Sequence, residues 1–211
     1  MVSVGALRKV TPTGAASTLA GASGFQQVVR DPTGFLVAAT SSAVYRVASD
    51  GTRTLLAGDP NTSGTVDGQG PSARFGSIRG FAIDGAGNVY VSQPSEDVIR
   101  RVAPDGTVIT YAGTPSQPGA LDGPRLGATF DGPAGLAVDE SGNLYVADSN
   151  NDTIRRISAA GNVSTVAGKA KNGGTDDGTG AAARFSYPGP LALDPAGNLL
   201  IVDSANFTIR G

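Results

Sequence analysis

The residues best suited to chemistry in this sequence are aspartates and arginines that recur in three glycine-rich stretches. These stretches read TSGTVDGQGPSARF, QPGALDGPRLGATF and NGGTDDGTGAAARF, and we call them the inserts (residues 62–75, 117–130 and 172–185). Carboxylates can bind cations or polar ligands, and guanidinium groups can bind anions. The sequence contains no His and no Cys. Imidazole and thiolate metal sites, disulfides and histidine general bases are therefore excluded.

The candidate ligand-binding residues lie in the inserts and in the loops that follow two predicted strands. They are Asp67, Asp122, Asp148, Asn150, Asp152, Asp177, Arg74 and Arg184. The competing interpretation is structural: each Asp-Gly step caps a turn, and each Arg pairs with a neighbouring loop. The segment TDDGTG at 175–180 resembles a calcium-binding loop, but it lacks the spaced carboxylates and the distal Glu of an EF-hand. We expect no metal site and no cofactor, with calcium as the alternative, and we predict no catalytic residue.

Adjacent arginines occur twice at the start of a predicted strand, as Arg100-Arg101 and Arg155-Arg156. Successive residues of a strand point to opposite faces of a sheet, so one Arg of each pair faces a given side. Either these arginines bind an anionic ligand, or they form a repeated salt bridge to an Asp of a neighbouring unit.

The stretch from 132 to 168 indicates the elements that position these residues. Its short apolar runs, LAVD, LYVA, TIRRI and VSTVA, are separated by turn-forming clusters of Asp, Ser, Gly and Asn. No window shows a helical period. The stretch therefore predicts four short antiparallel strands.

The same unit recurs at a fixed step. The motif x-A-G ends at Gly58, Gly113 and Gly168, each 55 residues after the one before. The step also relates three further sets: Ile99, Ile154 and Ile209; Asp84, Asp139 and Asp194; Phe75, Phe130 and Phe185. An earlier copy ends at Gly21 and is not followed by an insert. Such self-similarity is typical of a repeat architecture.

The repeat G-L-A-V-D-x-x-G-N-L-Y-V-A-D-x-x-N-x-x-I-R-x-I resembles the NHL repeat, which builds β-propeller blades. The D-G-x-G-x-x-A-R-F insert is similar to the longer inter-blade linker of bacterial members. The resemblance implies an all-β chain of four-stranded antiparallel blades. The first copy departs from the pattern, since Phe35 stands where later copies have Asn88, Asn143 and Asn198.

We predict one propeller domain over residues 1–211. It contains a half blade at 2–21, blades at 25–58, 75–113 and 130–168, and an incomplete blade at 185–211, which lacks a fourth strand. About four blade equivalents result. They form either a closed four-blade ring, with residues 16–20 completing the last blade, or an open arc completed by further protein or a second chain. The three Phe of the repeat are expected in the interblade core.

A four-stranded blade alternates its loops between two ends. The inserts and the loops at 93–97, 148–152 and 203–207 should therefore share one face, opposite a face of tight turns. Long loops on a rigid scaffold are where binding surfaces are usually built. This pattern predicts a non-catalytic binding or assembly scaffold whose partner is a protein, peptide or glycan, with self-association through open blade edges as a further possibility.

The alternative is a metal-dependent propeller enzyme. Some propellers of the family that this sequence resembles are lyases that rely on histidine, which is absent here. Others are calcium lactonases, which need carboxylates near the axis, but the predicted inner strands there read FAI, LAV and LAL and carry none. A net charge of −2 argues against nucleic acid. No apolar run reaches the ~20 residues of a membrane span, and no signal peptide is evident. The resemblance alone favours export, and localisation and native length stay open.

Overall fold

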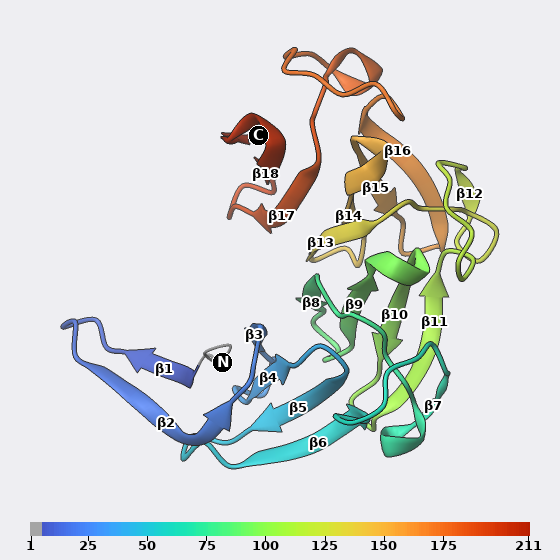
Figure 1. Cartoon of the computed structure of the whole chain (residues 1–211). Coiled ribbons are helices and arrows are strands. Elements are labelled where there is room, and N and C mark those ends of the chain that lie inside the picture. The colour runs from blue at the N-terminus through green and yellow to red at the C-terminus, as the bar shows by residue number, and fades with distance from the viewer. Residues whose placement is uncertain (1–5) are drawn as a thin grey trace.

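The computed structural model describes residues 6–211 as an array of β-sheets arranged around a common centre (Figure 1). The described strands are β1 (Ala6–Val10), β2 (Ala16–Ser23), β3 (Gln27–Arg30), β4 (Leu36–Ala39), β5 (Ala43–Val47), β6 (Arg53–Gly58), β7 (Gly68–Gln69), β8 (Phe81–Ile83), β9 (Val89–Gln93), β10 (Val98–Val102), β11 (Thr107–Ala112), β12 (Gly123–Pro124), β13 (Pro133–Val138), β14 (Leu144–Asp148), β15 (Thr153–Ile157), β16 (Asn162–Gly168), β17 (Pro188–Leu193), β18 (Leu199–Asp203) and β19 (Thr208–Arg210). The described residues also form five 3-10 turns, at Gly70–Ser72, Pro94–Glu96, Ser149–Asn151, Gly180–Ala182 and Ser204–Asn206.

Each blade is an antiparallel meander. The strand orders are β3-β4-β5-β6, β7-β11-β10-β9-β8, β12-β16-β15-β14-β13 and β17-β18-β19, and β1 pairs with β2 in a separate hairpin. The described strands thus form a two-stranded hairpin, a four-stranded sheet, two five-stranded sheets and a three-stranded sheet. The all-β propeller prediction is confirmed.

The short inner strands β3, β8, β13 and β17 contact one another in sequence around the centre. The blades approach one another closely at this centre. A Cβ added to Gly80 would lie only 1.9 Å from the Ala134 carbonyl oxygen. A Cβ on Gly135 would lie 2.2 Å from the Gly189 oxygen. Glycine is therefore required at these two positions, since any side chain would push adjacent blades apart.

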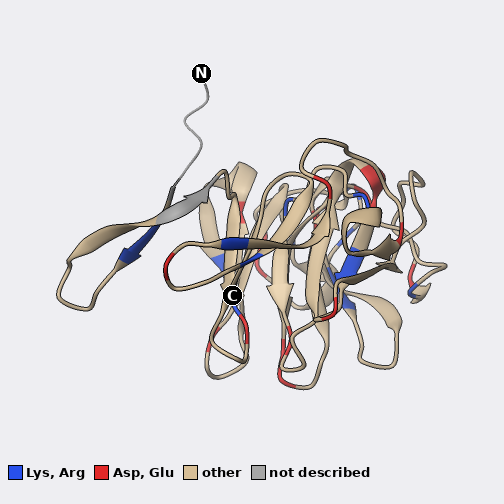
Figure 2. Ribbon diagram, turned by 90° about the horizontal axis from the view of Figure 1, so that it is seen from below, with Lys and Arg blue, Asp and Glu red and all other residues tan. Residues whose placement is uncertain are grey.

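The described strands do not close a ring by pairing. The hairpin β1–β2 is hydrogen-bonded to neither β17–β19 nor any other described sheet, and Figures 1 and 2 show it projecting away from the other sheets. Leu7 and Leu19 of this hairpin pack against the buried Ala38 and Val47 of that blade. Residues 16–20 therefore do not complete the last blade, as the closed-ring alternative had predicted.

The apolar core lies between blades. Phe75, Phe130 and Phe185 are 0%, 0% and 4% exposed, and each packs in a cluster that joins two blades or an insert to its blade. The prediction that these three rings form the interblade core is confirmed. Within the described residues no helix is both long enough and apolar enough to cross a membrane.

The inserts do not stay on one face, which corrects the sequence-based expectation. Each insert begins beside the loops at one end of the blades and then runs down the outer rim. There β7 pairs with the fourth strand β11, and the Gly70 N–H donates to the Gly106 carbonyl at the opposite end. The second insert repeats this course through β12 and the Arg125 N–H, which donates to Gly161. The middle of each of these two inserts is thus a fifth strand on the rim, because its backbone groups find partners on the exposed edge of the fourth strand. The third insert contains no described strand.

Candidate functional site

A β-bulge places one arginine of each recurrent pair inside its blade. The register of the third strand shifts between Ile99 and Arg100 and again between Ile154 and Arg155. A bulge re-aims the side chain next to it. Both Arg100 and Arg155 are 0% exposed, whereas Arg101, which follows Arg100, is half-buried.

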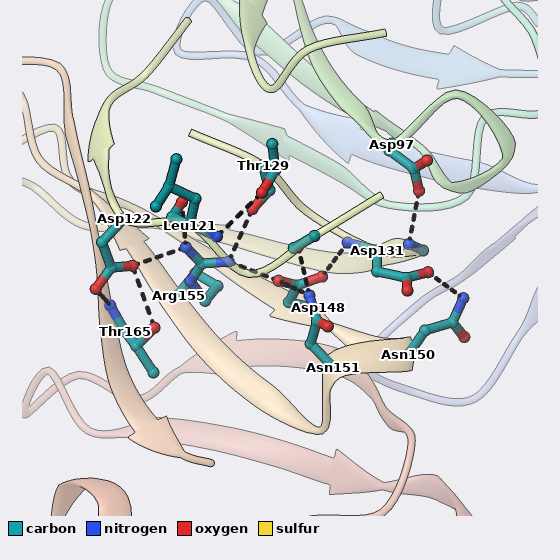
Figure 3. Close-up of polar contacts among 12 residues, drawn as sticks. Asp97, Leu121, Asp122, Thr129, Asp131, Asp148, Asn150, Asn151, Arg155 and Thr165 are labelled. Atoms are coloured by element: carbon teal, nitrogen blue, oxygen red, sulfur yellow. Dashed lines mark hydrogen bonds and ion pairs between the residues drawn. The ribbon is translucent and has the colours of Figure 1, made fainter. Parts of the chain in front are cut away.

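Arg155 is the centre of a polar network that joins an insert to its blade (Figure 3). Its Nη1 donates to Asp148 Oδ2 at 2.7 Å and to the Thr129 carbonyl at 3.0 Å. Its Nη2 donates to Asp122 Oδ1 at 2.7 Å and to the Leu121 carbonyl at 3.0 Å. Two carboxylates and two carbonyls therefore surround one buried cation, which is what burial of a charge requires.

Asp148 is the buried carboxylate of this network. Its Oδ1 accepts from the Asp131 N–H at 2.7 Å, and its Oδ2 accepts from Asn151 Nδ2 at 2.8 Å as well as from Arg155. Burial raises the pKa of Asp148 to about 6, although the hydrogen bonds from Asn151 and Asp131 and the charge of Arg155 act in the opposite direction. Every oxygen is engaged, so Asp148 orders the loop rather than facing a ligand.

The inserts carry the second carboxylate of each network. Asp67, Asp122 and Asp177 form ion pairs with Arg100, Arg155 and Arg210 respectively. The guanidinium carbon of each Arg also lies over the ring of the repeat Phe at the end of the same insert, at 5.6, 5.2 and 5.1 Å from the ring centroid. The salt-bridge interpretation is therefore the one that the structure supports, with the difference that the Asp comes from the insert of the same unit.

The second blade exchanges the acid and the amide of this network. Gln93 stands at the position of Asp148, and Glu96 stands at the position of Asn151. Arg100 donates to Gln93 Oε1 at 2.9 Å, and Gln93 Nε2 donates to Glu96 Oε2 at 3.3 Å. Each blade thus keeps one acid and one amide beside its arginine, but in the second blade the acid is not fully buried, and burial is the main cause that raises the pKa of Glu96.

The loops between second and third strands repeat one geometry. We call the surface formed by residues 93–97, 148–152 and 203–207 the loop face. Asp97 and Asp152 occupy the same left-handed conformation, with φ of 57° and 56°. Asp97 Oδ1 accepts from the Gly132 N–H at 3.0 Å, and Asp152 Oδ1 accepts from the Tyr187 N–H at 2.9 Å. Each Asp therefore ties its blade to the next.

The residues just before the second and third inserts are tied to the same loops. The Ser116 N–H donates to the Glu96 carbonyl at 2.8 Å, and the Lys171 N–H donates to the Asn151 carbonyl at 3.1 Å. Ser116 and Lys171 share a left-handed φ of 56° and 58°. The loop face is thus held by backbone and side-chain hydrogen bonds in each of these two units, so it is preorganised.

One polar cluster on the loop face occurs in a single unit. Lys171 Nζ forms an ion pair with Asp131 Oδ2 at 2.6 Å, and Asn150 Nδ2 donates to Asp131 Oδ1 at 2.8 Å. The Lys171 side chain is 60% exposed, and Asn150 is exposed. Hydrogen bonds from Lys171 and Asn150 and the charge of Lys171 outweigh partial burial and hold the pKa of Asp131 below its usual value. Donors and acceptors of this cluster are open to solvent.

The remaining predicted site residues have structural partners. Arg74 forms an ion pair with Asp59 at 3.4 Å and donates to the carbonyls of Pro71 and Ala73. Arg184 donates to the carbonyls of Ala181 and Ala183. The predicted set is therefore divided between insert, buried network and loop face, and only Asn150 and Asp152 lie on the loop face with partly or fully exposed side chains.

Sequence reasoning missed Asp131 and Lys171 as partners of Asn150, and it missed the bulge that buries Arg100 and Arg155. A signal for the second was available. The first blade has no insert, and at the position of Arg100 it has Tyr45, which packs edge-on against Phe25. The arginine therefore accompanies the insert. In the described part of the chain no group of three or more His, Cys, Asp or Glu side chains could hold a metal ion.

The meander blades, their shared centre and the loop face define this chain as a β-propeller array. The family model described as NHL repeat matches residues 130–157. Residues 130–157 are therefore an NHL repeat, which confirms the resemblance recognised from the sequence.

Several known proteins are similar to this chain over part of their length. Protein SUPPRESSOR OF QUENCHING 1, chloroplastic, from Arabidopsis thaliana is 37% identical over 114 residues, which are 51% of this chain and 11% of that protein. A structure of a protein of unknown function from Bacteroides thetaiotaomicron has a TM-score of 0.78 at 25% identity, covering 93% of this chain and 50% of that one. An auxiliary nutrient binding protein from Bacteroides ovatus has a TM-score of 0.74 at 21% identity, covering 93% and 49%.

These comparisons establish the fold. The chain spans about half the length of these two solved structures and about a tenth of the plant relative.

Proposed function

We propose that this chain is a non-catalytic binding module whose loop face binds a protein, a peptide or a glycan. The observation that carries the proposal is the preorganised loop face, where Asp97 and Asp152 tie each blade to the next by the same hydrogen bond. A surface that is already ordered pays little conformational entropy on binding.

The Asp131–Lys171–Asn150 cluster supplies the polar contacts for such a partner. The exposed ammonium of Lys171 and the exposed amide of Asn150 can donate to carbonyl, carboxylate or hydroxyl oxygens of a ligand. Asp131 holds both side chains in place. Peptides and sugars present oxygens of this kind at close spacing, which supports them as ligands.

The name of the similar Bacteroides ovatus structure supports the same proposal, because that protein is described as a nutrient binding protein. Its identity of 21% supports the fold alone, so the class of ligand rests on the residues of this chain.

The test is a printed array of oligosaccharides and overlapping peptides probed with the labelled chain. Binding to any positive spot is expected to fall by about tenfold in Lys171→Ala and in Asn150→Ala, because each removes one hydrogen bond to the ligand. The control is Glu140→Ala, which changes an exposed residue in a tight turn at the opposite end of the blades and should leave binding unchanged.

Two results would contradict the proposal. One is binding that persists unchanged in both loop-face variants, and the other is binding that is lost in Glu140→Ala. The non-catalytic part has its own test, since a stoichiometric metal ion retained after exhaustive dialysis would favour the metal-dependent enzyme instead.

A further inference from the structure

One part of the loop face carries side chains that depart from the repeat. It lies where the third blade meets the last blade, around the loop at 148–152. The departing residues are Asp131, Asn150, Lys171 and Tyr187. In the preceding unit the same positions hold small residues without charge: Gly76, Ser95, Ser116 and Gly132. The repeat specifies the scaffold, so large polar side chains added at one place on an ordered surface point to a specific contact.

Tyr187 holds a strained backbone conformation that packing does not explain. Its φ of 54° lies in the left-handed region, where the equivalent Gly132 has φ of 63°. A bulky residue is a rare outlier in this region, and such outliers cluster at ligand sites. The side chain of Tyr187 is nevertheless 43% exposed. The exposure belongs to the position, since the equivalent Ser77 is also exposed although complete blades stand on both sides of it.

Asp152 places a carboxylate oxygen beside this tyrosine. Its Oδ1 accepts from the Tyr187 N–H at 2.9 Å, whereas no described residue donates to Oδ2. A Cβ on Gly173 would lie 3.0 Å from this Oδ2, and Pro118 stands at the position of Gly173 in the preceding unit. Asp152 is half-buried, whereas its equivalent Asp97 is 7% exposed. Asp152 therefore keeps one acceptor oxygen for a ligand.

The polar cluster begins two residues away on the same loop. Figure 3 shows Asn150 with its amide nitrogen directed at Asp131, and Lys171 Nζ also donates to the Asn150 carbonyl at 3.0 Å. The positive charge of Lys171 is compensated by Asp131, to which it is ion-paired. The exposed ammonium and the exposed amide keep further donors and an acceptor for a ligand.

A neutral oligosaccharide matches these groups. The C–H faces of a sugar ring can pack flat on an aromatic ring, whose face carries partial negative charge. Each hydroxyl both donates and accepts, so a sugar can pair with Asp152 and with Lys171. Because Asp131 already compensates Lys171, Asp152 leaves one negative charge that disfavours an anionic ligand. A peptide backbone offers only one N–H donor per residue, which fits this density of polar groups less well.

We propose that the surface formed by Tyr187, Asp152, Asn150 and Lys171 binds a neutral oligosaccharide. One sugar ring packs on Tyr187 and donates a hydroxyl hydrogen bond to Asp152 Oδ2. A neighbouring sugar contacts the amide of Asn150 and the ammonium of Lys171. This inference rests on the proposed function of the loop face and names the class of ligand.

The test is isothermal titration calorimetry of the full chain with neutral hexasaccharides of glucose, mannose and xylose, and with a hexamer of galacturonic acid. Saturable binding of at least one neutral sugar is expected, and the acidic hexamer should bind more weakly. Tyr187→Gly should lower the affinity by about tenfold, because it removes the ring on which the sugar packs. Tyr187→Phe keeps the ring and should stay within about twofold of the unmodified chain.

The glycine variant also separates binding from folding. Tyr187→Gly restores the residue that the repeat has at Gly132 and relieves the left-handed strain, so its melting temperature should be no lower than that of the unmodified chain. Ser77→Ala changes the equivalent exposed position of the second blade and should leave sugar binding unchanged.

A second variant tests the acceptor oxygen. Asp152→Asn can keep the bond from Oδ1 to the Tyr187 N–H, but it places an amide nitrogen where Oδ2 accepts from the sugar. The affinity should therefore fall by about tenfold, as expected for loss of a hydrogen bond to a charged group.

The outcomes distinguish this inference from the proposed function. Binding of peptides alone, lost in Lys171→Ala, would overturn the sugar assignment and leave the binding role of the loop face standing. Absence of binding to both sugars and peptides would overturn both. Sugar binding that is unchanged in Tyr187→Gly, that falls equally in Ser77→Ala, or that is lost together with a lower melting temperature of Tyr187→Gly would overturn the inference alone.

Discussion

The buried cation of the third blade allows a sharp comparison between two equivalent positions. Arg155 and Arg100 are both fully buried, and each pairs with an insert Asp that is about half exposed. They differ in the side chain that accepts a hydrogen bond from Nη1 of the arginine. This side chain is the buried carboxylate of Asp148 for Arg155 and the neutral amide of Gln93 for Arg100. Replacing each Arg with Met removes the charge and keeps much of the volume.

The structure predicts unequal costs for the two substitutions. Arg155→Met leaves Asp148 as a fully buried carboxylate without a cation, and breaking a buried pair in this way costs about 3–5 kcal/mol. Arg100→Met leaves the neutral Gln93 and an acid, Glu96, that keeps access to water. The loss is therefore mainly that of the hydrogen bonds of Arg100, about 1–3 kcal/mol. The difference of about 2 kcal/mol therefore measures the stranded charge.

The dependence on pH follows from the same carboxylate. Burial already raises the pKa of Asp148 from 3.8 to about 6, and loss of Arg155 raises it further. Because the folded-state pKa lies above the unfolded value, the folded state gains stability as the pH falls from that folded pKa towards 3.8. The deficit of Arg155→Met relative to the unmodified chain should therefore be largest above the raised pKa of Asp148 in the variant and should shrink as the pH falls towards about 6. Below that pH it should stay level, because Asp148 is then protonated in both folded chains.

Urea unfolding followed by far-UV circular dichroism measures both effects, since the chain has no Trp. The double variant Arg155→Met with Asp148→Gln, which copies the neutral partner of the second blade, should regain part of the loss. The reasoning is refuted if Arg100→Met costs as much as Arg155→Met, or if the deficit of Arg155→Met grows as the solution is acidified.

Three further predictions concern stability. Phe130→Ala should lower the free energy of unfolding in urea by about 3–5 kcal/mol, because Phe130 is fully buried. Phe207→Ala should lower it by close to nothing, because Phe207 is 93% exposed, and similar losses for both variants would contradict the assignment of Phe130 to the core. Hydrogen bonds from Thr165 and Arg155 outweigh partial burial and lower the pKa of Asp122, so its stabilisation should be complete above pH 3.8 and lost on acidification, and the gap between the unmodified chain and Asp122→Asn should close below that pH. Gly113→Ala should lower the melting temperature more than Gly14→Ala, because both have φ near 90° but only a Cβ on Gly113 meets a backbone oxygen, at 2.5 Å; equal shifts would contradict the clash.

The fold was predictable from this chain because its information is local and repeated. A step of 55 residues, turn clusters at fixed places and x-A-G strand ends together specify four short strands per unit. The last residue of each x-A-G motif, Gly58, Gly113 or Gly168, has φ of 89–90°, and a Cβ added there would lie about 2.5 Å from a backbone oxygen. The motif that revealed the repeat is therefore itself a steric requirement. The buried Phe of each unit followed from the same regularity.

The candidate site was less predictable, because its contacts join residues that are far apart in the sequence. The insert carboxylates looked like ligands for a partner, but Asp122 meets Arg155, 33 residues later, and Asp131 meets Lys171, 40 residues later. The expectation that the inserts stay on one face was also wrong. The first and second inserts run along the rim because they pair with the open edges of β11 and β16, and these edges exist only in the folded blades.

The sequence by itself determined the kind of blade, the number of units and the residues that recur, because periodic patterning and steric demands at glycine act over a few neighbouring residues. Only the tertiary structure decided which carboxylates are buried partners and which are exposed. The physical reason is that a carboxylate is free to bind a partner only when distant parts of the chain leave its oxygens without hydrogen bonds. Packing of blade against insert decides this exposure, which is 0% for Asp148, 49% for Asp122 and 98% for Asp177.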